Sequence, residues 1–98
     1  MYKFTKTNPD FWVQLKGDNA GKPLRVVMPN SIGILTDHEI LDPQFFYYVV
    51  EYLFLSGRFR VHIMGSVIPY IRQQDIRQVI NQFLIEKYAQ TEQFKIAV

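Results

Sequence analysis

The chain of 98 residues contains no cysteine and only two histidines. Without cysteine it can form no disulfide framework, thiolate zinc site or iron–sulfur cluster. An excess of charge is also lacking, because 11 Lys and Arg against 9 Asp and Glu leave a formal net charge of +2. The longest apolar stretch, residues 45–55, is interrupted by Glu51 and is far shorter than the ~20 residues of a membrane span. Residues 1–6 lack the apolar core of a signal peptide. We therefore expect a cytoplasmic protein without a cofactor, a metal or a membrane partner.

What the chain does contain is typical of a globular protein. Apolar residues make up 48% and charged residues 20% of the sequence, which excludes a disordered chain. A chain of this length buries enough surface for one core and is too short for two. No repeat or linker interrupts it. We expect residues 1–98 to form a single domain.

Two helices are expected. The first begins at Asp42-Pro43, where Asp is a good N-cap and Pro suits the first helical position, and it ends before Gly57. This helix, about 43–56, is apolar nearly all round, which is typical of a buried centre or an interface. In the second helix, about 75–89, apolar residues recur every three or four positions.

Several short segments have the pattern of strands. The clearest is 58–64, where apolar and cationic residues alternate; weaker candidates are 2–7, 11–16, 24–28, 31–35 and 67–71, where Pro69 indicates an edge strand or a bend. The tail, 91–98, is expected to fray or to add a last strand. The fold class is therefore α+β, with a small mixed or antiparallel sheet packed on one buried aromatic helix and a C-terminal amphipathic helix.

No pattern indicates catalysis or metal binding. Gly17–Lys22 has three residues between its glycines where a phosphate-binding loop needs four, and Pro23 follows where that loop has Ser or Thr. None of the serines Ser31, Ser56 and Ser66 lies in a nucleophile elbow. The two histidines lack metal-ligand spacing. We expect a protein that is not an enzyme, although a His–Asp pair formed only by the fold stays open.

Cationic residues cluster after the aromatic helix. On a strand, Arg58, Arg60 and His62 would share one face at intervals of about 7 Å, close to the phosphate spacing of a nucleic-acid strand. Glutamine can bond an adenine edge in two places. The candidate nucleic-acid contacts are Arg58, Arg60, His62, Arg72, Gln73 and Gln74, with Lys22, Arg25 and Lys16 in an earlier loop region. The alternative is a solvated outer strand face.

The segment Gly65–Ile76, preceded by a Pro-started helix and a predicted strand, resembles part of a known domain. Over about residues 24–80 the chain is similar to the second half of a target-recognition domain in type I restriction-modification specificity subunits. This resemblance implies a mixed α/β fold and contact with duplex DNA through strands and loops. The predicted helix after Asp75 departs from the family, which returns to a strand there.

The chain also resembles a family of small uncharacterised proteins from gut Bacteroidetes. The shared segments are Asn8-Pro9, Gly21–Leu24, Pro29-Asn30 and Gly65–Ile71.

Two functional hypotheses follow. The first is a non-enzymatic DNA-binding module that resembles the recognition domain. The second is a protein–protein interaction or homodimeric assembly module, because the two predicted helices carry more apolar surface than one small core needs.

Overall fold

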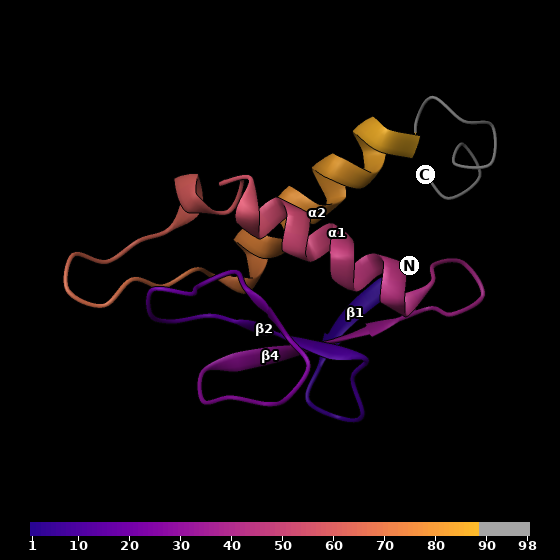
Figure 1. Ribbon diagram of the computed structural model, residues 1–98, viewed down its shortest axis with the longest axis horizontal. Coiled ribbons are helices and arrows are strands. Elements are labelled where there is room, and N and C mark those ends of the chain that lie inside the picture. The colour runs from indigo at the N-terminus through magenta and orange to yellow at the C-terminus, as the bar shows by residue number, and fades with distance from the viewer. Residues whose placement is uncertain (89–98) are drawn as a thin grey trace.

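The computed structural model describes residues 1–88 and has two layers, a sheet and a pair of helices (Figure 1). The predicted fold class, α+β with an antiparallel sheet, is confirmed. The elements are β1 (Tyr2–Thr5), β2 (Phe11–Gln14), β3 (Pro23–Leu24), β4 (Ser31–Thr36), α1 (Pro43–Leu55), the 3-10 turn η1 (Arg60–His62) and α2 (Gln73–Tyr88). The expectation for residues 91–98 lies outside the described residues.

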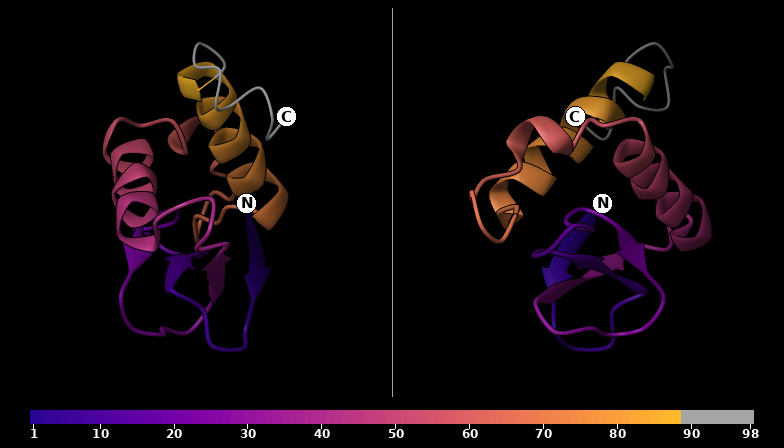
Figure 2. Two further views of the ribbon diagram at one scale, coloured as in Figure 1. Left: turned by 90° about the vertical axis from the view of Figure 1, so that its right-hand side faces the viewer. Right: turned by 60° about the vertical axis from the view of Figure 1, so that its left-hand side comes forward.

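The sheet has the strand order β1-β4-β2-β3, and every neighbouring pair is antiparallel. In the register, Ile34 of β4 lies opposite Phe4 of β1 and Phe11 of β2, so the apolar side chains of three strands share one face. Both helices lie on the same side of the sheet, and they diverge from each other (Figure 2). The helix-facing side of the sheet therefore forms the floor of the core.

Helix α1 forms where its end signals predict. The Asp42 carboxylate accepts a hydrogen bond from the Phe45 backbone N–H at 2.9 Å, and Pro43 takes the first helical position. At the other end Ser56 is the C-cap, and Gly57 adopts φ +82°, a conformation that side chains with a Cβ resist. The prediction of a helix over 43–56 is confirmed.

The core lies between the sheet and the inner faces of both helices. α1 contributes residues at the spacing of one helical face, and α2 does the same from its own side. The buried residues are Phe11, Val13, Ile32 and Ile34 from the sheet, Phe46, Val49, Val50 and Leu53 from α1, and Ile76, Val79, Ile80 and Leu84 from α2.

Helix α2 is tied to the edge strand β1. The Tyr2 hydroxyl donates to Asn81 Oδ1 at 2.8 Å, and burial raises the pKa of Tyr2 to about 12 although Arg77 opposes the rise. The Arg77 guanidinium also lies 4.9 Å from the centre of the Phe4 ring. α2 begins at Gln73, two residues before the predicted start. The prediction of a helix there is correct.

The prediction of a strand over 58–64 is wrong. η1 (Arg60–His62) occupies this segment, and the Arg60 N–H donates to the Gly57 carbonyl three residues back. Only Phe59 enters the core, whereas Val61 is 82% exposed. Alternation of apolar and cationic residues over so short a segment fits a tight turn as well as a strand, because burial of Phe59 alone is enough to hold such a turn against the core.

The predicted strand over 67–71 is also mostly absent. Met64 and Tyr70 exchange backbone hydrogen bonds at 2.8 and 2.9 Å, which makes 64–70 a short arm. Gly65 has φ +92°, and a Cβ there would lie 2.4 Å from the Ile68 carbonyl oxygen, so the turn requires glycine. The base of the arm is held to the segment after β2, because the Gly17 N–H donates to the Pro69 carbonyl at 2.8 Å, while Val67 and Ile68 at its tip stay exposed.

Within residues 1–88, no helix combines the length and the apolar character that crossing a bilayer requires.

Candidate functional site

The most distinctive surface lies on the side of α1 that faces away from the core. Four large side chains, Phe45, Tyr48, Tyr52 and Leu55, form what we call the outer stripe. Their exposed fractions range from 43% for Phe45 to 70% for Leu55. They are spaced by three, four and three residues, which places them along one line on the helix. α1 is therefore apolar on two faces, and only one of them packs on the core.

Two arginines lie against the tyrosines of this helix. The Arg25 guanidinium carbon is 3.8 Å from the centre of the Tyr47 ring and 5.9 Å from that of Tyr48. The Arg58 guanidinium carbon is 5.6 Å from the centre of the Tyr52 ring. All three distances fit cation–π contacts. Within residues 1–88 neither arginine has a carboxylate within 4.0 Å, so their charges are available to a partner.

The two ends of α1 carry opposite charge. Exposed acidic residues precede the helix, and exposed basic residues follow it. The acidic residues are Asp37, Glu39 and Asp42, and the basic ones are Arg58 and Arg60, with His62 behind them.

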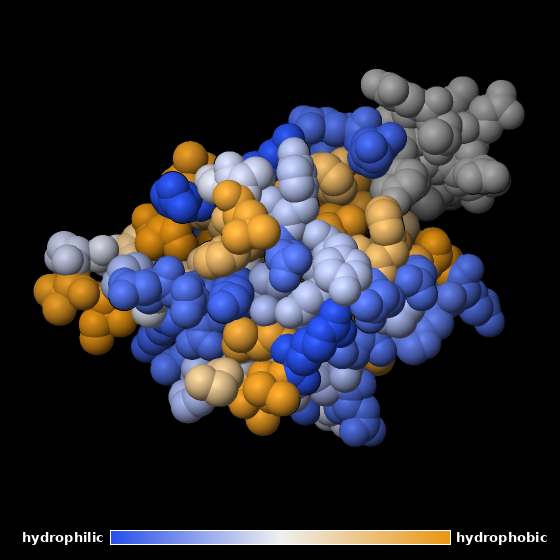
Figure 3. Space-filling view, in the orientation of Figure 1, coloured by the Kyte–Doolittle hydropathy of each residue, from blue (hydrophilic) through white to orange (hydrophobic). Residues whose placement is uncertain are grey.

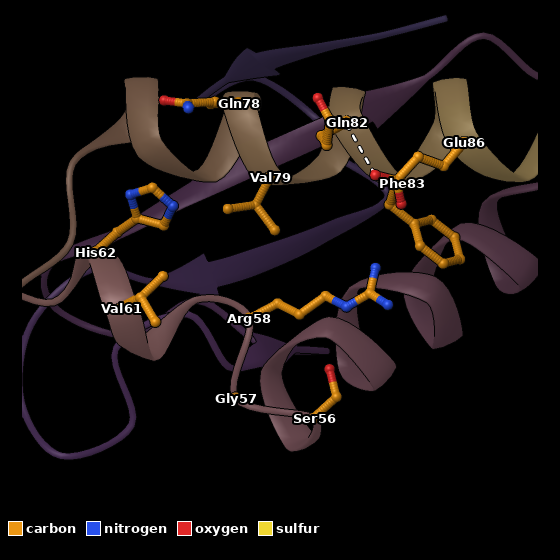
Figure 4. A pocket seen from close by; sticks show the side chains of 10 residues that line it. All are labelled: Ser56, Gly57, Arg58, Val61, His62, Gln78, Val79, Gln82, Phe83 and Glu86. Carbon is orange, nitrogen blue, oxygen red and sulfur yellow. Dashed lines mark hydrogen bonds between the residues drawn. The ribbon is translucent and has the colours of Figure 1, made fainter.

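A groove of about 610 Å³ lies where the end of α1, η1 and α2 meet (Figure 4). Val61, Val79 and Phe83 give it apolar walls, while Arg58 extends across it toward Phe83. Gln82 donates its amide to the Glu86 carboxylate at 2.8 Å on the far side. The groove offers mixed polar groups but no nucleophile paired with a base.

Asp75 connects η1 to α2. Its buried carboxylate accepts hydrogen bonds from Arg72 Nε at 2.8 Å and Arg72 Nη2 at 3.1 Å, and it lies 3.8 Å from His62 Nδ1. The hydrogen bonds from Arg72 outweigh burial and hold the pKa of Asp75 below its usual range. The same contact raises the pKa of Arg72. Two of the candidate nucleic-acid contacts, Arg72 and His62, therefore engage this carboxylate.

The other candidate nucleic-acid contacts are separated in the fold. Arg60 is exposed on η1, and Gln73 and Gln74 are exposed in the first turn of α2, beside it. Lys22 is exposed before β3, and Arg25 follows that strand and stacks on α1. The structure thus brings η1 and the start of α2 together through Asp75, but it forms no strand with cations at regular spacing.

Two further groups of apolar side chains are exposed, both on loops. The predicted strand over 24–28 ends at Leu24, and Val26, Val27 and Met28 lie on the loop that follows. Val67 and Ile68 form the tip of the arm 64–70. Figure 3 shows hydrophobic side chains gathered at the left-hand tip and below the centre, whereas the surface between them is mixed. Unlike the outer stripe, neither group is held at fixed spacing by a helix.

Besides His62 and Asp75, a second His–Asp pair forms through the fold. His38 Nε2 lies 2.9 Å from Asp10 Oδ1, and Asp10 Oδ2 accepts from the Thr36 N–H at 2.8 Å. Burial opposes ionisation of Asp10, but these hydrogen bonds outweigh it and lower the pKa. The pair ties the loop after β4 to the start of β2. Among residues 1–88, no three His, Asp or Glu side chains gather to hold a metal ion.

The residues 2–98 match the model of a family of unknown function (DUF6943), so the chain belongs to that family. No curated protein and no solved structure matches it. Because the description of the family assigns no activity, the functional inference rests on the surface geometry.

Proposed function

We propose that this member of the family is a non-enzymatic protein-interaction module that docks a partner on the outer stripe of α1. The observation that carries the proposal is that α1 has a second apolar face, Phe45, Tyr48, Tyr52 and Leu55, which stays 43–70% exposed. Only Tyr52 has an aromatic neighbour on α2, the Phe83 ring at 5.9 Å, among the described residues. Exposed apolar side chains at one line on a rigid helix are typical of helix–helix interfaces.

The composition of the stripe supports this proposal. Aromatic residues and Arg are enriched at protein interfaces, and Tyr and Arg are frequent among the residues that dominate binding energy. Two tyrosines of the stripe each have an arginine nearby, Arg25 at Tyr48 and Arg58 at Tyr52. The tyrosine hydroxyls keep the surface compatible with water until a partner covers it.

Site-specific photo-crosslinking tests the proposal. A benzophenone amino acid replaces Tyr48 in one strain and Tyr70 in another, and both full-length variants are irradiated in the cells that make the protein. Tyr70 is the matched control, because it is a partly exposed tyrosine on the arm 64–70. We expect a defined adduct from position 48 and none from position 70. No adduct from position 48, or equal adducts from both, would contradict the proposal.

Nucleic-acid binding is the second candidate. What supports it is the contact of His62 on η1 with Asp75 in the first turn of α2, which brings the turn that carries Arg60 close to the turn that carries Gln73 and Gln74. The resemblance to target-recognition domains favours the same region. It ranks second because Asp75 engages both Arg72 and His62.

Fluorescence anisotropy with labelled mixed-sequence duplex DNA tests the second candidate. We expect micromolar affinity that weakens steeply with salt, and a loss of binding in Arg58→Glu/Arg60→Glu. Lys3→Glu/Lys6→Glu, which changes the net charge equally on the edge strand β1 and the loop after it, is the control. No binding at low salt, or equal losses in both variants, would rule out this surface.

A further inference from the structure

We infer that the partner of the outer stripe is a second copy of this chain, with the two α1 helices packed antiparallel across a twofold axis. The inference rests on the proposed function, because it names the partner of that same surface. α1 lies along the left-hand side of the molecule and α2 lies to its right, so two copies can approach at the α1 side (Figure 2, left).

The order of side chains along the stripe is self-complementary. Tyr48 and Tyr52 stand two residues on either side of Val50, and Phe45 and Leu55 stand five residues on either side. In an antiparallel pair centred on Val50, Tyr48 faces Tyr52 of the second copy, and Phe45 faces its Leu55. A twofold axis requires this reciprocity. The spacing of three, four and three is that of a two-helix seam, over a length of about 15 Å.

The charges at the ends of α1 are self-complementary too. An antiparallel arrangement places the acidic end of one copy against the basic end of the other, and it does so twice. The paired groups are Asp37, Glu39 and Asp42 on one side and Arg58 and Arg60 on the other. A parallel arrangement would instead oppose like charges at both ends, so charge selects the antiparallel one.

Glu51 is the only charged residue within α1, and it lies beside the stripe near the expected axis. The two Glu51 carboxylates of a dimer would approach each other there. Arg25 stacks on Tyr47, one turn before Glu51, but forms no ion pair with Glu51 in the described residues, so it offsets only part of this repulsion. We therefore expect Glu51→Gln to tighten the association by a few-fold, because like charges at an interface disfavour binding. A weaker association in this variant would contradict the antiparallel pairing of the two α1 helices around Val50.

Sedimentation velocity of the full chain over a dilution series provides the test, with two charge-reversed variants. One variant is Arg58→Glu/Arg60→Glu, which makes both ends of α1 acidic. The other is Asp37→Lys/Glu39→Lys/Asp42→Asn, which makes both ends of α1 basic and in which Asn keeps the N-cap of α1. We expect the wild type to dimerise with a concentration-dependent profile, and each variant alone to dimerise at least about tenfold more weakly.

An equimolar mixture of the two variants is the decisive sample. The acidic end of the first variant then faces the basic end of the second, and the complementarity returns at both ends. We expect the mixture to recover dimers that neither variant forms alone. A misfolded variant would not recover, and circular dichroism of each variant checks its folding independently.

Three results would overturn the inference: a wild type that stays monomeric at about 1 mM, a mixture that recovers nothing although both variants are folded, and unchanged dimers in both variants. A monomeric protein whose photo-crosslink from position 48 joins a different protein would overturn the self-association but leave the proposed function standing. The two failures are therefore distinguishable.

Discussion

The inner and the outer face of α1 are both apolar, yet they are made of different side chains. The inner face has three aliphatic residues and one phenylalanine, all buried, and the outer stripe has three aromatic residues and one leucine, all exposed. The members are Phe46, Val49, Val50 and Leu53 inside and Phe45, Tyr48, Tyr52 and Leu55 outside. Aliphatic side chains suit a permanently dry, closely packed core. Tyrosine, with an apolar ring and a polar hydroxyl, suits a surface that alternates between water and a partner.

The largest expected effect comes from the same substitution on the two faces. Leu53 on the inner face is fully buried, whereas Leu55, two residues later on the outer stripe, is 70% exposed. Leu53→Ala should lower the free energy of unfolding by about 2–5 kcal/mol, because it leaves a cavity in the core. Leu55→Ala should change it by no more than about 0.5 kcal/mol in dilute monomer. Urea denaturation at low protein concentration measures both, and equal losses would contradict the division into two faces.

The next effect concerns Asp75, which connects η1 to the start of α2. Asp75→Ala removes the acceptor of two charge-assisted hydrogen bonds from Arg72 and should cost about 1.5–3 kcal/mol. Thermal unfolding of this variant and of Gln78→Ala, an exposed position on the same helix, gives the comparison. If the two variants melt alike, Asp75 does not hold η1 in place.

Acid should reproduce part of that loss. Since the pKa of folded Asp75 is lowered, its stabilising contribution is present above the ordinary aspartate pKa of about 3.9 and is lost as the pH falls through the folded value. Asp10, whose pKa is also lowered, acts in the same direction. Asp75→Asn should therefore flatten, but not abolish, the acid dependence of the unfolding free energy. An unchanged pH profile would contradict the role of Asp75.

A smaller effect is expected from Asp42, the N-cap of α1, because the helix that carries both faces begins there. Asp42→Ala removes the acceptor for the Phe45 N–H and should cost about 0.5–2 kcal/mol of unfolding free energy. Asp42→Asn keeps the cap and should cost less. Equal losses in the two variants would show that the negative charge, rather than the cap, stabilises α1.

The smallest effect is expected where arginine meets the outer stripe. The Arg58 side chain is exposed and 5.6 Å from the centre of the Tyr52 ring. Arg58→Ala should lower the free energy of unfolding of the monomer by about 0.5–1 kcal/mol at most. Urea denaturation checks this value, and a loss as large as that of Leu53→Ala would place Arg58 in the core rather than at an interface.

The sequence predicts α1 well because its signals are local. An Asp-Pro start and a Gly end define the helix without reference to the rest of the chain. The same sequence left two readings of α1, a buried centre or an interface, because a helix that is apolar nearly all round has no polar face to mark the solvent side. The buried-centre reading is confirmed for the inner face, whereas the exposed outer stripe leaves the interface reading a prediction.

The wrong strand prediction over 58–64 and the unpredicted contact of His62 with Asp75 both depend on parts of the chain that are distant in the sequence. Alternation over a short segment does not reveal whether a neighbouring strand exists to pair with it. Arg72 and Asp75 are three residues apart, so their contact is local to the start of α2, whereas His62 reaches the same carboxylate only because the fold places η1 beside that helix. Two candidate DNA contacts, Arg72 and His62, thus engage the protein's own carboxylate.

Amide NMR spectra over a dilution series of the full chain test the central claim most directly. The account predicts that the shifts that change with concentration belong to Phe45, Tyr48, Tyr52 and Leu55 and to the charged ends of α1, while the buried face, typified by Val50, and the exposed apolar loops 26–28 and 67–68 stay unchanged. Concentration-dependent shifts confined to those loops, or none at any concentration, would contradict the claim that the outer stripe of α1 is where copies of the protein meet.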